Sequence, residues 1–209
     1  MFPLFQYIIY LAVLISLVRY IALRENGFLL LLIFCLFNSV VETVAFYIED
    51  NAWLYNLSTI LEFIMLSRLF YLHTISKKIR IFNFVLLLLF LISSVINLIF
   101  VQKLWVFNSY TVVLGFSFLV LIACFSEYDL MIKGSSSSVF KNPILWISAG
   151  VTLFYTGSFF IMGMYNIIIK KYMPLFDTLK NVLQALNMIM YLFFIVAVLC
   201  LPKKKKSFI

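Results

Sequence analysis

Residues 28–48 read FLLLLIFCLFNSVVETVAFYI, and this stretch decides the class of fold. It carries a single charged residue, Glu42. A helix needs about 20 mostly apolar residues to cross a bilayer, so the stretch is long enough to span one. Its apolar residues do not alternate with polar ones, as they would in a strand of a membrane β-barrel. The stretch therefore predicts a transmembrane helix.

The rest of the chain has the same character. Its 209 residues are 65% hydrophobic and only 11% charged, whereas about 25% of a soluble domain is charged. This composition excludes soluble enzymes, nucleic-acid-binding domains and disordered tails, because a surface facing water needs more charge. Seven apolar runs of helical length fill the chain, at 2–22, 28–48, 53–73, 81–101, 105–125, 144–168 and 175–201. We therefore predict an all-α, polytopic membrane protein, in which residues 1–209 form a single seven-transmembrane-helix bundle.

The placement of Lys and Arg predicts the orientation of this bundle. In the seven-span arrangement, 12 of the 16 basic residues fall on the side where the first span ends. These are Arg19, Arg24, Arg68, Lys77, Lys78, Arg80, Lys133, Lys141, Lys203, Lys204, Lys205 and Lys206. The other side holds Lys103, Lys170, Lys171 and Lys180. Because basic residues are enriched on the cytoplasmic side, we expect the N-terminus outside and the C-terminus in the cytoplasm.

Two cytoplasmic segments could contact another protein. Residues 126–143, with the run Gly134-Ser-Ser-Ser-Ser138, predict a flexible loop. Residues 202–209 form a basic tail that carries Lys203, Lys204, Lys205 and Lys206. The loop either tethers two helices or docks a cytoplasmic protein, and the tail anchors the topology or binds a partner. Arg68 and His73 are weaker contact candidates on this side, and no direct binding to nucleic acid is expected.

Two carboxylates fall inside predicted spans. Glu42 lies six residues from the outer end of its span, about 9 Å deep, and Glu62 lies nine residues beyond Trp53, about 13 Å deep. A charged side chain inside a bilayer costs at least about 2.5–3.5 kcal/mol on insertion scales. Each carboxylate therefore needs a partner or a water-filled cavity, and both belong to the outer half of the bundle.

Helical spacing extends this cluster. In the last span, Asp177, Lys180, Gln184, Asn187 and Tyr191 follow one another at intervals of three and four, which places them on one face. We predict a polar pocket for a ligand or an ion, with an ion pair between the glutamates and Lys180. Its residues are Glu42, Glu62, Lys180, Gln184, Asn187, Asn56, Asn38 and Tyr155. The alternative is that these polar groups only hold the helices together.

Most membrane-enzyme chemistries are excluded by residue counts. The chain has one His and three scattered Cys, so zinc hydrolases that need several His do not fit. Lys180 lies too near the start of the last span for a retinal Schiff base. No catalytic constellation, metal site or cofactor is expected.

Three strings resemble a known group of proteins. They are DNAWLYNLSTILEF at 50–63, NPILWISAG at 142–150 with YTG at 155–157, and LNM at 186–188. They resemble motifs of small, uncharacterised seven-helix inner-membrane proteins of Bacteroidetes-type bacteria. The matching residues are Trp53, Tyr55, Asn56, Glu62, Phe63, Gly150, Tyr155, Gly157 and Asn187. The resemblance implies a topology and a multi-pass location in the bacterial inner membrane, but no activity. Membrane accessory proteins of CRISPR and other defence systems are similar in size and hydropathy.

These observations favour a non-enzymatic inner-membrane sensor or accessory protein. It would bind a ligand in the outer polar pocket and act through a cytoplasmic protein partner, in a signalling or defence system. A channel or transporter for ions or protons that uses Glu42 and Glu62 is the first alternative, and a lipid-modifying enzyme is the second. The lipid bilayer is the other expected partner, and a homo-oligomer is left open.

Overall fold

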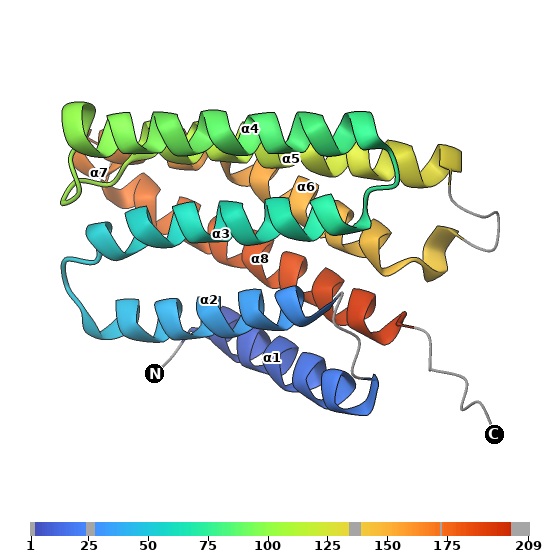
Figure 1. Ribbon diagram of the computed structural model, residues 1–209. Helices are drawn as coiled ribbons and strands as arrows, with labels where there is room; N and C mark the ends of the chain where they lie inside the picture. The colour runs from blue at the N-terminus through green and yellow to red at the C-terminus, as the bar shows by residue number, and fades with distance from the viewer. Residues whose placement is uncertain (1–2, 24–27, 134–138, 172, 202–209) are drawn as a thin grey trace, which may run out of the picture.

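The computed structural model describes residues 3–23, 28–133, 139–171 and 173–201, and it is built from helices (Figure 1). The helices are α1 (Leu4–Leu23), α2 (Leu29–Tyr47), α3 (Ala52–His73), α4 (Lys77–Ile96), α5 (Ser109–Lys133), α6 (Pro143–Gly163), α7 (Tyr165–Lys171) and α8 (Met173–Leu199). A π-helical turn, Asn97–Val101, extends α4, and a 3₁₀ turn, Val139–Lys141, precedes α6. No strand occurs in these residues, so the all-α prediction is confirmed.

Six of the long helices form a closed ring. Around it, α1 packs on α2, α2 on α3, α3 on α5, α5 on α6, α6 on α8, and α8 again on α1. α4 lies outside the ring, against α3 and α5 (Figure 1). The largest fully buried side chains include Phe34, Phe63, Tyr155, Tyr191 and Phe194, which come from α2, α3, α6 and α8. The interior of the ring is therefore filled by aromatic side chains from helices on opposite sides.

Within the described chain, six helices are long and apolar enough to cross a membrane. They cover Leu4–Ala22, Leu29–Tyr47, Lys77–Val101, Ser109–Ile132, Pro143–Gly163 and Pro174–Leu199. The protein is therefore a multi-pass membrane protein. α3 has 22 residues but is not among the six, because polar residues such as Asn56, Glu62 and Arg68 lower its hydropathy.

The loop expected at 126–143 is shorter than predicted. α5 continues to Lys133, so residues 126–133 are helical, and residues 134–138 lie outside the described residues. The helix continues because its last turns are bound to a neighbouring turn. Asp129 Oδ2 accepts hydrogen bonds from the amides of Ile75 and Ser76, both at 2.7 Å, and the Ser126 hydroxyl lies 3.3 Å from that of Thr74.

Two other helices also have bounds that differ from those of the expected spans. The span expected at 105–125 begins at Ser109, because residues 102–108 form a turn that carries the exposed Trp105. The span expected at 144–168 ends at Gly163, and the short helix α7 follows it. The amide of Met164 still donates to the carbonyl of Phe160, so the helical hydrogen bonding of α6 continues to its last turn, before the chain changes direction.

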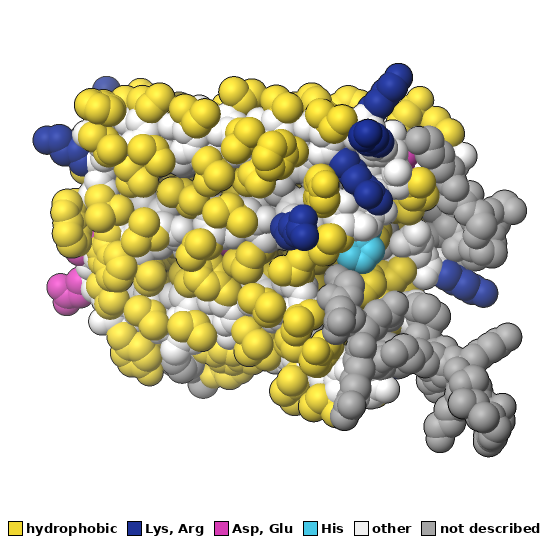
Figure 2. All heavy atoms as spheres, in the orientation of Figure 1, with side chains coloured by type: hydrophobic (Ala, Val, Ile, Leu, Met, Phe, Trp, Pro, Cys, Tyr) yellow, Lys and Arg dark blue, Asp and Glu magenta, His cyan; other side chains and the backbone are white. Residues whose placement is uncertain are grey.

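The two ends of the bundle differ in charge. α3, α5 and α8 end at one end, which we call the basic end, and Lys and Arg side chains gather over it where α3 ends and α4 begins (Figure 2). Described basic residues at this end are Arg19, Arg68, Lys77, Lys78, Arg80 and Lys141. The opposite end has the exposed acidic residues Glu49 and Asp50 as well as Lys103, Lys170 and Lys171. Arg24 and the tail lysines lie outside the described residues.

α6 and α8 approach each other closely at two glycines. A Cβ atom added to Gly150 would lie 2.9 Å from Cβ of Phe193 and 3.3 Å from the carbonyl oxygen of Met190. A Cβ atom added to Gly157 would lie 2.8 Å from Cδ1 of Leu186. Small residues let helices pack closely where hydrocarbon replaces water outside. This contact sets the position of the polar residues that α6 and α8 turn toward the ring interior.

Candidate functional site

Glu42 and Glu62 are two carboxylates in the half of the ring that lies farther from the basic end. Glu42 lies five residues before the end of α2 and is half-buried. The Tyr55 hydroxyl of α3 donates to its Oε2 atom at 3.2 Å. Its backbone carbonyl accepts a further bond, at 2.9 Å, from Nε2 of Gln6 in α1. Glu42 is therefore held in place by side chains from the helices on both sides of α2.

Glu62 has no comparable support. It lies ten residues beyond the start of α3, which places it about 15 Å along the helix, and it is half-buried. It interacts electrostatically with Glu42, Tyr155 and Tyr191. Its carboxylate forms no hydrogen bond within the part of the chain that the structure describes. The two carboxylates therefore share one region, but only Glu42 has a donor.

α6 brings unpaired hydroxyl groups to the same region. Tyr155 is 1% exposed and its side chain interacts electrostatically with Glu62. Its hydroxyl group has no hydrogen-bond partner among the described residues, and neither do those of Thr152 and Ser158. The three residues follow one another at intervals of three and share one side of α6. Buried polar atoms are nearly always hydrogen-bonded in proteins, so three exceptions on one helix face need an explanation.

α8 contributes an amide and a second buried tyrosine. Tyr191 is 1% exposed and interacts electrostatically with both Glu42 and Glu62. Asn187 lies one turn earlier on the same face, and its buried Oδ1 atom has no partner among the described residues. We call Glu42, Tyr55, Glu62, Tyr155, Asn187 and Tyr191 the carboxylate–tyrosine cluster.

An aromatic layer lies beyond the cluster, toward the opposite end of the bundle. Tyr55 interacts electrostatically with Tyr165 of α7. The Tyr165 ring lies 4.3 Å from that of Phe107 and 5.6 Å from that of Phe176, measured between centroids. Burial raises the pKa of the Tyr165 hydroxyl, so it stays neutral at ordinary pH. These rings come from the turn before α5, from α7 and from α8.

Lys180 and Asn38, which were predicted for the site, are placed differently. Lys180 is exposed, and no ion pair joins it to Glu42 or Glu62 in the described part of the chain. Gln184 is half-buried on the same helix. Asn38 is buried and donates to the carbonyl of Phe34 in its own helix at 3.1 Å. The structure therefore brings Glu42, Glu62 and Tyr155 together without the predicted lysine.

Asn56 instead organises the turn between α4 and α5. Its Nδ2 atom donates to the carbonyls of Leu104 and Val106, at 2.7 and 2.8 Å. Its Oδ1 atom accepts a bond of 2.8 Å from the amide of Asn108. All the polar atoms of this side chain are engaged, so Asn56 has a structural role.

Tyr55 and Tyr191 belong to the cluster but were not predicted as site residues. The sequence carries a signal for each of them. Tyr55 precedes Glu62 by seven residues, two turns of helix, and Tyr191 continues the polar face of α8 four residues after Asn187. Tyrosine is common in apolar spans, so this spacing becomes informative only when the carboxylates are known to face inward.

Two of the predicted cytoplasmic contacts, Arg68 and His73, lie at the basic end. Arg68 is exposed there, while His73 is half-buried, bonds to the carbonyl of Leu69 through Nδ1 at 2.8 Å, and packs on the ring of Phe28. Lys203, Lys204, Lys205 and Lys206 lie outside the described residues.

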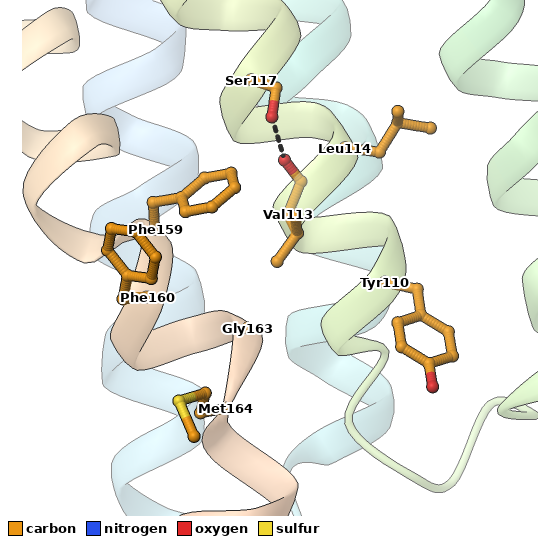
Figure 3. Close-up of a pocket in the computed structure, with 8 residues that line it drawn as sticks. All are labelled: Tyr110, Val113, Leu114, Ser117, Phe159, Phe160, Gly163 and Met164. Atoms are coloured by element: carbon orange, nitrogen blue, oxygen red, sulfur yellow. Dashed lines mark hydrogen bonds between the residues drawn. The ribbon is translucent and has the colours of Figure 1, made fainter.

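An open groove between α5 and α6 is apolar, unlike the carboxylate–tyrosine cluster (Figure 3). Its lining residues are Tyr110, Val113, Leu114, Ser117, Phe159, Phe160, Gly163 and Met164. The Ser117 hydroxyl donates to the carbonyl of Val113 at 2.8 Å, so it is already satisfied. The groove therefore presents mainly apolar surface, which suits a hydrocarbon chain of the bilayer.

Comparisons with protein-family models, with curated proteins and with solved structures gave no match.

Proposed function

We propose that the protein is a non-enzymatic sensor of the bacterial inner membrane that binds a small cation in the carboxylate–tyrosine cluster. In this proposal all seven long helices cross the bilayer, with α3 as the polar one that carries the site. The N-terminus lies outside, and the basic end faces the cytoplasm, as the positive-inside rule favours. The cluster then lies in the outer half of the membrane.

The observation that carries the proposal is the buried, unpaired hydroxyl of Tyr155, whose side chain interacts electrostatically with Glu62, a residue without a hydrogen-bond donor among the described residues. A buried polar group such as this hydroxyl costs about 1–3 kcal/mol when it has no partner. Groups intended only to hold helices together would bond to one another. A ligand that completes these bonds explains why they are left open.

The open groups favour a cation over an anion. An ionised Glu62 carboxylate can only accept hydrogen bonds, and so can the Oδ1 atom of Asn187. The hydroxyls of Tyr155 and Ser158 can accept as well as donate. The rings of Tyr155 and Tyr191 add aromatic faces, which attract cations electrostatically. No described basic side chain forms an ion pair with either glutamate, so a cation would balance the charge of an ionised carboxylate here.

The packing of the half of the bundle nearer the basic end favours a sensor over a channel. Toward the basic end the core contains Leu31, Leu66, Phe70, Phe194 and Val198, each at most 2% exposed. A row of apolar side chains gives a hydrated ion no groups to replace its water. Binding would instead alter helix packing, which a cytoplasmic protein could read at the basic end.

Thermal unfolding of the purified full-length protein tests the binding proposal. The midpoint is measured in sodium, magnesium, ammonium or tetramethylammonium chloride at matched ionic strength. We expect at least one cation to raise the wild-type midpoint and Glu62→Gln to abolish the rise. Glu49→Gln removes an exposed carboxylate from the same end and should respond as the wild type does. Equal responses from all three proteins would refute the proposal.

Ion conduction is the second candidate, because two carboxylates lie along one region of the ring. Ion flux into proteoliposomes separates it from sensing. Conduction predicts flux that Glu62→Gln reduces at least tenfold, whereas a sensor gives no flux above empty vesicles in either form.

A further inference from the structure

Two arginines at the basic end converge on a single tyrosine. The Cζ atom of Arg68, near the end of α3, lies 5.3 Å from the centroid of the Tyr71 ring. The Cζ atom of Arg80, in the first turn of α4, lies 5.9 Å from the same centroid. Figure 2 shows that basic side chains gather over this part of the surface. The guanidinium groups of two helices therefore lie against the ring of one tyrosine.

Neither arginine forms an ion pair with an acidic side chain in the described chain. Arg80 donates a hydrogen bond to a described residue only through its Nε atom, to the carbonyl of Thr74 at 2.6 Å. Asp129, across the same turn, accepts hydrogen bonds from the amides of Ile75 and Ser76. The terminal guanidinium nitrogens of both arginines thus remain available as donors for an anion.

The pair lies near the end of α3 and the start of α4. Arg68 precedes the end of α3 by five residues, which corresponds to about 8 Å. It is exposed on the side of an apolar bundle, where a long basic side chain extends toward the interface. Lys77 and Lys78 are exposed beside it at the start of α4. Basic groups between helices at this level bind the phosphates of anionic lipids.

We infer that Arg68, Tyr71 and Arg80 form a binding site for the phosphodiester of an anionic phospholipid at the turn between α3 and α4. The planar guanidinium groups donate to phosphate oxygens in pairs, while Tyr71 keeps both groups in position. The lipid would bridge α3 of the ring to α4 outside it. This site is separate from the carboxylate–tyrosine cluster and does not depend on the proposed function.

The test measures the thermal unfolding midpoint of the detergent-solubilised full chain against increasing phosphatidylglycerol, phosphatidylcholine or inorganic phosphate. We expect phosphatidylglycerol alone to raise the midpoint. Arg68→Gln should weaken its apparent affinity about fivefold, the effect of losing one basic contact near an anionic surface. Lys171→Gln removes an exposed positive charge at the opposite end and should leave the affinity unchanged.

Three results would overturn the inference. Phosphatidylcholine could stabilise the protein as much as phosphatidylglycerol, or Lys171→Gln could weaken binding as much as Arg68→Gln, which would indicate non-specific attraction. Inorganic phosphate could also reproduce the whole effect, which would assign the site to a soluble anion. Because Arg68 is exposed, its substitution should not unfold the protein, and the midpoint without lipid checks this.

Discussion

Glu42 and Glu62 lie in the same bundle but differ in the hydrogen bonds that their carboxylates accept. Glu42 receives the Tyr55 hydroxyl, whereas Glu62 lies beside a tyrosine whose hydroxyl has no partner in the described chain. The difference is one of geometry, because Tyr55 lies on the helix next to that of Glu42, whereas Tyr155 comes from α6, which α5 separates from α3 in the ring. At this scale, Glu42 has a hydrogen-bond donor and Glu62 has none among the described residues, which is why the proposal assigns binding to Glu62.

The two tyrosines should respond in opposite ways to removal of their hydroxyls. Tyr55→Phe breaks the bond to Glu42 and should lower the free energy of unfolding by about 0.5–1.5 kcal/mol. Tyr155→Phe removes a hydroxyl that is unpaired without ligand, so it should leave that free energy unchanged or raise it.

Denaturation in detergent, with and without the stabilising cation, checks both changes. We expect Tyr155→Phe to weaken the effect of the cation although the protein without ligand is intact. If Tyr155→Phe destabilises the protein more than Tyr55→Phe does, the assignment of Tyr155 to the binding site is incorrect.

Among the elements, α6 and α8 position half of the cluster through their close contact. At Gly150 the neighbours of an added Cβ are a Cβ atom and a backbone oxygen, neither of which can turn away. At Gly157 the neighbour is the end of the Leu186 side chain, which can adopt another rotamer. The register of the two helices therefore depends more on Gly150 than on Gly157.

Gly150→Ala should accordingly lower the free energy of unfolding by about 1–3 kcal/mol, the usual cost of forcing an extra methyl group into a packed interface. Gly157→Ala is the matched control and should cost clearly less. Unfolding of both variants in detergent gives the comparison. Equal costs at the two positions would show that the two helices do not approach as closely at Gly150 as described.

The helices differ in how well the sequence predicts them. Unbroken apolar runs predicted the long helices, because burying backbone in hydrocarbon leaves few alternatives to a helix. Their ends were harder to place: α5 runs past its apolar stretch because Ser126 and Asp129 bind the turn at 74–76. Such contacts join segments about 50 residues apart, and hydropathy carries no information about them.

The candidate site was predictable to a similar degree. Depth predicted Glu42 and Glu62 in one half of the bundle, and helical spacing turned Tyr155 toward the same interior; in the structure Glu62 interacts electrostatically with both Glu42 and Tyr155. The ion pair with Lys180 is not found, since a flexible lysine near the start of α8 reaches the surface at lower cost than burial of its charge. Asn56 is engaged by a turn whose carbonyls no sequence pattern identifies.

For the whole molecule, the alternation of seven long helices places the described start and end of the chain at opposite ends of the bundle (Figure 1). The proposed orientation puts Glu49 outside the cell and Lys141 in the cytoplasm. Both are exposed, so each can carry a reporter.

Cysteine labelling tests this orientation. In a background where Cys35, Cys124 and Cys200 are replaced by serine, Glu49→Cys should react with a membrane-impermeant maleimide in intact cells. Lys141→Cys should react only after the cells are permeabilised. The reverse pattern would move the cluster to the cytoplasmic half of the membrane.

The central claim is that the carboxylate of Glu62 itself receives a cation. The most direct measurement is the infrared difference spectrum of the reconstituted protein with and without the cation that stabilises it most. We predict a carboxylate band that changes on binding, disappears in Glu62→Gln and persists in Glu49→Gln. A band that is unchanged in Glu62→Gln would contradict the claim.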